Sequence, residues 1–108
     1  MSKIERSKAT ARILIEIGAI NFSLLSPFKL SSGFLSPSYI DCRKIIAHPS
    51  AFKSITEMMI DTIKSDMAFQ TPDYIIGGET AGIPFAAVIA QKMGLPLSYV
   101  RKQPKNYG

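Results

Sequence analysis

Two segments of the sequence combine residue types that can bind an anion. The first is the loop Gly78–Gly82, in which glycine lets the backbone approach a ligand closely and Thr80 supplies a hydroxyl. An apolar segment follows, and the unpaired amide hydrogens at the start of a helix favour phosphate or pyrophosphate. A plain strand-to-helix turn also needs glycine for its geometry, so this loop taken by itself leaves both interpretations open.

The second segment is the basic stretch Arg101-Lys102-Gln103-Pro104-Lys105. Arginine presents a fork of donors to phosphate oxygens, and lysine presents a compact positive charge. A basic stretch of this kind is often only a solvated surface segment. Its position directly after an apolar segment with the character of a strand favours an anion site.

The glycine loop lacks the residues of the common nucleotide-binding motifs. The spacing of Gly77 and Gly82 resembles the start of a P-loop, but Ile83-Pro84 stand where lysine and serine or threonine should follow. The sequence also contains no G-x-G-x-x-G motif. His48, the only histidine, precedes a proline and is interpreted as structural; Cys42, the only cysteine, is interpreted as a small buried side chain.

The positive charge is concentrated in two terminal patches. Of the net charge of +5, residues 1–12 contribute +3 and residues 101–105 another +3, while the remainder sums to −1. Aromatic residues do not interleave with these cations, so we expect no nucleic-acid binding. The longest stretches without a charge, 17–28 and 80–91, are shorter than the ~20 apolar residues of a membrane span. We therefore expect no membrane segment. Without a secretory signal in the first ten residues, we also expect a cytoplasmic location.

Two helices are predicted to support these segments. Apolar spacing predicts a helix over residues 2–18, which Gly18 can end in a left-handed conformation. A second helix is expected from Pro49 to Met67, because proline is favoured at the first helical position. Its apolar face and its charged face are predicted as Phe52, Ile55, Met59 and Ile63, and as Lys53, Glu57 and Asp61.

Short strands should lie between and after these helices. Phe28–Leu30 and Tyr39–Asp41 are predicted as two strands joined by a turn region centred on Gly33. Tyr74–Gly77, Ile83–Met93 and Leu97–Val100 are predicted as a strand, a helix buried on most sides and a second strand. Strands joined in this way are parallel. The carboxyl ends of both strands should then bring the glycine loop and the basic stretch to one sheet edge, where open sheets bind ligands.

Three segments, FKLSSGFLSPSYID, GGETAGIP and YVRKQPKNYG, occur in the order and at the spacing of orotate phosphoribosyltransferases. The sequence resembles this family from about residue 10 to Gly108. The resemblance implies an α/β fold with a parallel sheet flanked by helices, an N-terminal helix and a small β hood. Residues 1–48 would form the N-terminal helix and hood segment, and residues 49–108 a helix and the strand-helix-strand unit. The implied reaction transfers phosphoribose from 5-phosphoribosyl 1-diphosphate (PRPP) to orotate, releasing pyrophosphate and orotidine 5′-phosphate.

The resemblance also assigns the substrate-binding residues. Orotate would lie near Tyr39 and Ile40, with Ser31 where many members have lysine. Pyrophosphate would lie at Thr80 and Ala81, in a loop that often contains a cis peptide bond before a residue other than proline. Mg²⁺ is bound together with the diphosphate substrate in the family, and no protein ligand for it can be identified in this sequence. The family's diphosphate-binding cations, some reaching into the neighbouring subunit of a homodimer, match Arg101, Lys102 and the catalytic Lys105.

The chain departs from the family pattern in two respects. Asn106-Tyr107 stand where many members have Asp-His, and the sequence contains no two adjacent acidic residues. The family's second half supplies such a pair in its ribose and 5′-phosphate sites. We therefore expect the N-terminal half of one domain, inactive alone, with an apolar strand edge that a complementary C-terminal chain would cover. The alternatives are a non-catalytic module that binds anionic metabolites and a gene remnant.

Overall fold

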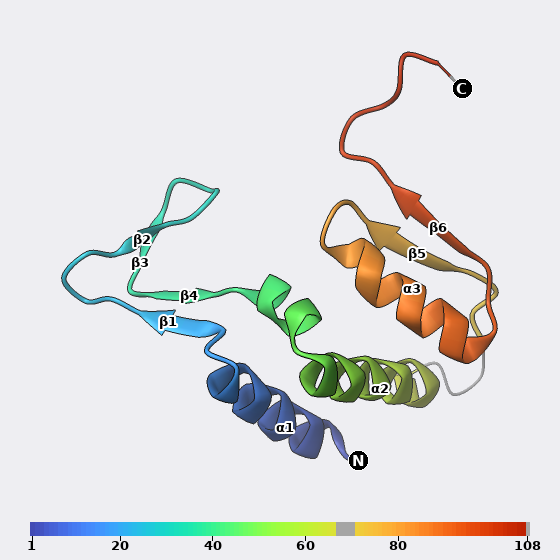
Figure 1. The fold of residues 1–108 in the computed structure, drawn as a ribbon, viewed down its shortest axis with the longest axis horizontal. Coiled ribbons are helices and arrows are strands. Elements are labelled where there is room, and N and C mark those ends of the chain that lie inside the picture. Colours follow the sequence, from blue (N-terminus) through green and yellow to red (C-terminus); the bar gives the residue numbers. More distant parts are fainter. Residues whose placement is uncertain (67–70, 108) are drawn as a thin grey trace. The chain divides into compact units, whose positions relative to one another are not determined.

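The computed structural model describes residues 1–66 and 71–107. The chain is of the α/β class, as predicted, and divides into two compact units, Met1–Phe52 and Lys53–Gly108 (Figure 1). In chain order the elements are α1 (Lys3–Glu16), β1 (Ile20–Phe22), β2 (Phe28–Lys29), β3 (Leu35–Ser36), β4 (Ser38–Ile40), the 3-10 helix η1 (Cys42–Ala47), α2 (Pro49–Asp66), β5 (Ile75–Gly78), α3 (Gly82–Met93) and β6 (Leu97–Val100).

The ends of helix α1 follow from local chemistry. At the start, the hydroxyl of Ser2 accepts a hydrogen bond from the backbone N–H of Glu5 at 3.1 Å. At the other end, Gly18 adopts a φ of +70°, a conformation that costs glycine little because it has no Cβ. The predicted helix and its glycine stop are therefore confirmed.

The hood strands pair differently from the prediction. β1 pairs antiparallel with β4, and β2 pairs antiparallel with β3 around the turn at Gly33. The predicted turn at Gly33 is confirmed by its φ of +90°, but the two strands that we expected it to join belong to different pairs. β1 and β3 were not predicted, because strands of two or three residues are too short to show an alternating pattern.

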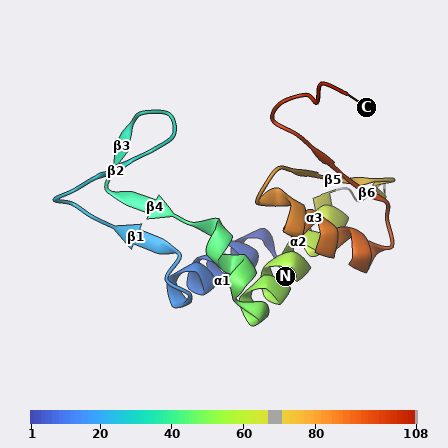
Figure 2. The ribbon, with the colours of Figure 1, turned by 45° about the horizontal axis from the view of Figure 1, so that its top comes forward.

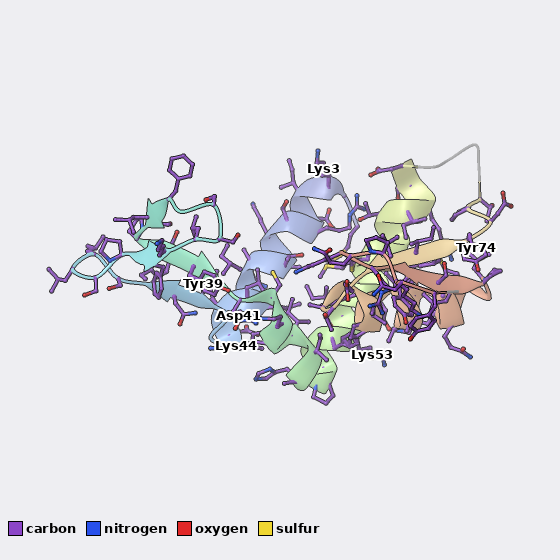
Figure 3. All side chains as sticks on the ribbon, turned by 90° about the horizontal axis from the view of Figure 1, so that it is seen from above. Lys3, Tyr39, Asp41, Lys44, Lys53 and Tyr74 are labelled. Carbon is purple, nitrogen blue, oxygen red and sulfur yellow. The ribbon has the colours of Figure 1, made fainter. Side chains whose placement is uncertain are left out.

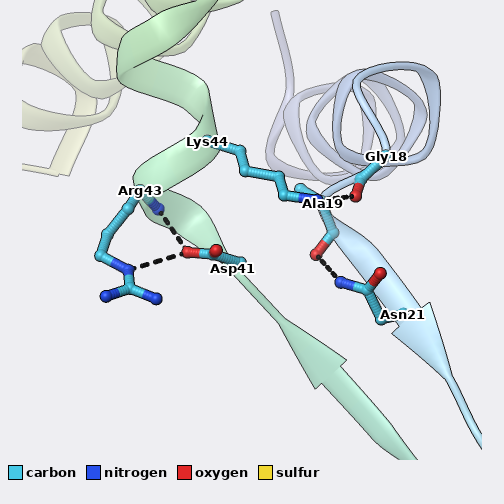
Figure 4. Close-up of polar contacts among 6 residues, drawn as sticks. All are labelled: Gly18, Ala19, Asn21, Asp41, Arg43 and Lys44. Atoms are coloured by element: carbon cyan, nitrogen blue, oxygen red, sulfur yellow. Dashed lines mark hydrogen bonds and ion pairs between the residues drawn. The ribbon is translucent and has the colours of Figure 1, made fainter.

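A polar cluster connects β1 and η1 (Figure 4). The Lys44 ammonium donates to the Gly18 carbonyl at 3.0 Å, and the backbone N–H of Asp41 donates to the Ala19 carbonyl at 2.8 Å. Ala19 and Ile45 are buried within this unit. The prediction that Cys42 is buried is wrong: it is the first residue of η1 and is exposed, outside the small core.

Helix α2 begins at Pro49 as predicted, and its expected last residue, Met67, lies outside the described residues. Its predicted charged face is exposed. The predicted apolar face is wrong at Met59, which is 41% exposed, whereas Met58 and Thr56 are buried. The buried residues of α2 lie on both sides of Met59 around the helix. The buried surface therefore does not coincide with the face that the apolar residues predicted. The buried positions in this helix are Ala51, Ile55, Thr56, Met58 and Ile60.

The second unit contains the predicted strand-helix-strand arrangement. β5 and β6 are parallel, in register from Ile75↔Leu97 to Gly78↔Val100, and α3 runs along them (Figure 2). Gly94 ends α3 with a φ of +66°. β6 has the predicted bounds and β5 begins one residue later than predicted. The expectation that α3 is buried on most sides holds in part, because Ala86, Ile89 and Ala90 are buried while most other positions are half-buried.

Gly77 allows α3 to pack closely on β5. A Cβ at this position would lie 2.8 Å from the Ala86 Cβ and 3.0 Å from the Gly82 carbonyl oxygen. On the other side of the strands, Ile76 and Val100 remain 59% and 58% exposed. Among the described residues β5 pairs only with β6. No described helix has the length and hydropathy needed to cross a membrane.

Candidate anion-binding site

The ends of β5 and β6 bring the glycine loop and the basic stretch together. Gly78 and Val100 are register partners at the carboxyl ends of the two parallel strands, so the following segments leave the same sheet edge. The backbone N–H of Glu79 donates to the Val100 carbonyl at 2.9 Å. In addition, the Glu79 carboxylate accepts a hydrogen bond from the backbone N–H of Lys102. The predicted proximity of the two segments is confirmed.

The loop leads directly into the amino end of α3. The Glu79–Thr80 peptide bond is cis, as the family resemblance implied for this loop. The Ile83 N–H donates to the Thr80 carbonyl at 3.2 Å, and the cap residue Ala81 makes no side-chain hydrogen bond to the helix. The first turn of α3 therefore has amides that a ligand oxygen can cap. Thr80 is exposed and Ala81 is half-buried, so the loop is open to solvent.

The basic stretch supplies three exposed cations, those of Arg101, Lys102 and Lys105. The Arg101 Nε donates to the Gln103 carbonyl at 3.4 Å, and the Lys105 Nζ lies 5.7 Å from the centroid of the Tyr107 ring. No ion pair found in residues 1–66 and 71–107 uses these cations. Their charges are therefore available to an anion.

The sequence-predicted orotate residues belong to the other unit, Met1–Phe52. Tyr39 and Ile40 are neighbours on β4 and are 36% and 52% exposed. The Tyr39 ring lies 5.8 Å from that of Phe28, measured between centroids. Ser31 is exposed in the turn between β2 and β3. These two strands form a different pair from β4, which pairs with β1.

Two charged residues near Tyr39 were not singled out from the sequence. Arg43 Nε lies 3.0 Å from an Asp41 carboxylate oxygen (Figure 4). Asp41 follows β4 and lies near Tyr39 (Figure 3). The hydrogen bond from Arg43 holds the pKa of Asp41 below its usual value, and the same bond raises the pKa of Arg43. The Tyr39 side chain makes a smaller contribution to the raised Arg43 pKa. Because this cluster depends on the turn into η1, which was not predicted, the sequence pattern did not reveal it.

Glu79 was also missed as a member of the anion site. A single carboxylate in a glycine loop has no distinctive sequence pattern, and its bond to Lys102 joins residues 23 positions apart. The strand register was the one available signal, because it places residue 79 next to the end of β6.

Comparison with known proteins agrees with this geometry. Residues 42–107 match the family described as the phosphoribosyl transferase domain. Orotate phosphoribosyltransferases from Roseobacter denitrificans and Rhizobium etli are 51% and 48% identical over 104 and 102 residues, which are 96% and 94% of this chain. These matches cover 46% and 44% of the relatives, so the chain spans less than half of their length.

The fold is also that of solved phosphoribosyltransferases. The crystal structure of orotate phosphoribosyltransferase from Aeropyrum pernix superposes with a TM-score of 0.71 and 31% identity, over 89% of this chain and 58% of that one. The family match covers most of the described second unit and includes both anion-binding segments. On the sequence match and the shared fold together, the chain belongs to the phosphoribosyltransferase family.

Proposed function

We propose that this chain supplies the diphosphate-binding part of an orotate phosphoribosyltransferase. The reaction would transfer phosphoribose from PRPP to the N1 nitrogen of orotate and release pyrophosphate. The names of its relatives support the substrate, since the relative that is 51% identical over 104 matched residues is an orotate phosphoribosyltransferase. The observation that carries the proposal is the junction of the glycine loop and the basic stretch at one sheet edge.

The arrangement suits the charge that develops during this reaction. As the bond between the sugar C1 atom and the diphosphate oxygen breaks, negative charge accumulates on the leaving pyrophosphate. Arg101, Lys102 and Lys105 would stabilise that charge, and Lys105 would act directly on the leaving group. Thr80 and Ala81 would hold the pyrophosphate through the loop and the first turn of α3.

Orotate would bind to the hood segment. Tyr39 presents an aromatic ring that is partly exposed, and Ile40 follows it on β4. Ser31 would contribute a hydroxyl from the neighbouring turn. Arg43 adds a cation beside Tyr39, which suits the carboxylate of orotate.

Mg²⁺ would arrive as part of the PRPP complex. The described residues contain no group of three acidic, histidine or cysteine side chains that could hold a metal ion. The remaining contacts to PRPP would come from a second copy in a homodimer or from a complementary C-terminal chain. We propose a cytoplasmic location, which agrees with the single cysteine of the sequence.

Calorimetry with Mg²⁺–PRPP tests the anion site directly. The chain should bind PRPP, with an affinity that falls as salt increases, because the contacts are ionic. Absence of binding at low salt would contradict a preformed diphosphate site in this chain.

A complementation assay tests the reaction. The chain would be mixed with the part of the Roseobacter denitrificans relative that it does not match, and orotidine 5′-phosphate would be measured. Product from the mixture but not from either part supports the proposed enzyme. PRPP binding by the chain without product in any mixture would favour the second candidate, a non-catalytic anion-binding module, which the exposed basic stretch also fits.

A further inference from the structure

We propose that Glu79 is a positioning residue that holds the start of the basic stretch in place at the cost of some anion affinity. The inference rests on the proposed diphosphate site and adds to it a residue that does not itself bind the ligand. It also predicts that two substitutions of Glu79, by glutamine and by alanine, change pyrophosphate binding by different amounts.

Glu79 makes hydrogen bonds to the residues on both sides of Arg101. The backbone N–H of Glu79 donates to the Val100 carbonyl at 2.9 Å, and the Glu79 carboxylate accepts from the Lys102 N–H. These contacts hold the residues immediately before and after Arg101. We call this pair of hydrogen bonds the Glu79 clasp.

The clasp matters because the basic stretch has little other support. Regular structure ends at Val100, and residues 101–107 are exposed. The contacts described for the Arg101 and Lys105 side chains, to Gln103 and Tyr107, lie within residues 101–107. Removing the Glu79 carboxylate should therefore release Lys102 from the glycine loop.

The negative charge of Glu79 has the opposite effect on anion binding. The basic stretch provides three positive charges, and the Glu79 carboxylate offsets one of them, leaving a local charge of +2. Such a carboxylate repels a polyanionic ligand. Glutamine keeps the acceptor oxygen and removes the charge, whereas alanine removes both. Glu79→Gln should then bind pyrophosphate more tightly than the unchanged chain, and Glu79→Ala should lose much of that gain.

The first measurement is amide hydrogen exchange of Lys102 by NMR, without ligand, in the unchanged 108-residue chain and both variants. We expect exchange about tenfold or more faster in Glu79→Ala, the loss expected for a hydrogen bond to a charged acceptor. Glu79→Gln should lie closer to the unchanged chain, and this variant controls for the effect of charge on exchange. Equal exchange in all three proteins would overturn the clasp.

The second measurement is calorimetric titration with inorganic pyrophosphate at low salt. We expect Glu79→Gln to bind about threefold or more tightly than the unchanged chain, and the gain to shrink as salt rises. Glu79→Ala should bind more weakly than Glu79→Gln. Equal affinity of the two variants for pyrophosphate would overturn the positioning role, because the variants differ in the hydrogen-bond acceptor and not in charge.

Matched controls are Glu57→Gln and Glu57→Ala. Glu57 is a carboxylate of the same unit, on α2, and its partner is Lys92 at 3.7 Å. Both variants should leave Lys102 exchange unchanged. If no protein of the set bound pyrophosphate, the proposed function and the anion role of Glu79 would both fail, while Lys102 exchange would still decide whether the clasp exists.

Discussion

The contacts that stabilise each unit internally differ between the two units of the chain. In Met1–Phe52 the strand pairs are short, the Lys44 side chain of η1 donates to the Gly18 carbonyl, and the Asp41 carboxylate accepts from the Arg43 N–H. In Lys53–Gly108, a parallel strand pair and the close packing of α3 at Gly77 leave little room for side chains. The stability of the second unit should therefore be sensitive to added atoms, and the stability of the first unit to the loss of polar groups.

The largest effect is expected at Gly77. Gly77→Ala places a Cβ against Ala86 and the Gly82 backbone, so it should lower the free energy of unfolding by about 1–3 kcal/mol. Gly78→Ala is the matched control, because nothing lies within 4 Å of a Cβ there. Urea denaturation measures both. Equal stability of the two variants would contradict the close helix-strand packing.

The next effect concerns the ligand and is confined to the second unit. Lys105→Ala removes an exposed cation from the basic stretch and should weaken pyrophosphate binding by about 1–2 kcal/mol, with a shallower dependence on salt. Lys53→Ala, an exposed cation of α2, is the control and should leave binding unchanged. If both variants lost affinity equally, net charge would explain binding and the basic stretch would have no special role.

A smaller effect is expected in the first unit. Lys44→Ala removes the hydrogen bond to the Gly18 carbonyl and should lower the free energy of unfolding by about 0.5–1.5 kcal/mol. Lys29→Ala removes an exposed lysine of β2 and should have less effect. Thermal denaturation followed by circular dichroism compares them. If Lys44→Ala left the stability unchanged, side-chain hydrogen bonds would not be what stabilises this unit.

The smallest effect is the pH dependence of Asp41. The hydrogen bond from Arg43 lowers the pKa of Asp41 below 3.8, so its contribution to stability is present above that pH and is lost as the pH falls through the lowered pKa. Carboxyl NMR titration should give Asp41 a pKa below 3.8. Arg43→Gln should raise the Asp41 pKa. No change in that variant would exclude Arg43 as the main cause.

The difference between the units also explains which parts of the fold were predictable. Helix α1, the start of α2 and the β5–α3–β6 order follow from local patterns, and Gly18 adopts the left-handed conformation that its position predicted. In the hood, the strands contain two or three residues, so their partners depend on segments that are distant in sequence. The burial of Met58 and the exposure of Cys42 likewise depend on segments that are distant in sequence, so the local pattern did not predict them.

The sequence by itself determined the α/β class, the parallel unit and the two anion-binding segments, because glycine geometry, apolar periodicity and charge act over a few neighbouring residues. Only the tertiary structure decided the pairing of β1 with β4, the cluster around Asp41 and Arg43, and the Glu79 clasp. Each of these depends on where the backbone turns after a strand ends. Such turns bring together groups whose hydrogen bonds cannot be predicted from residue types and their spacing in the sequence.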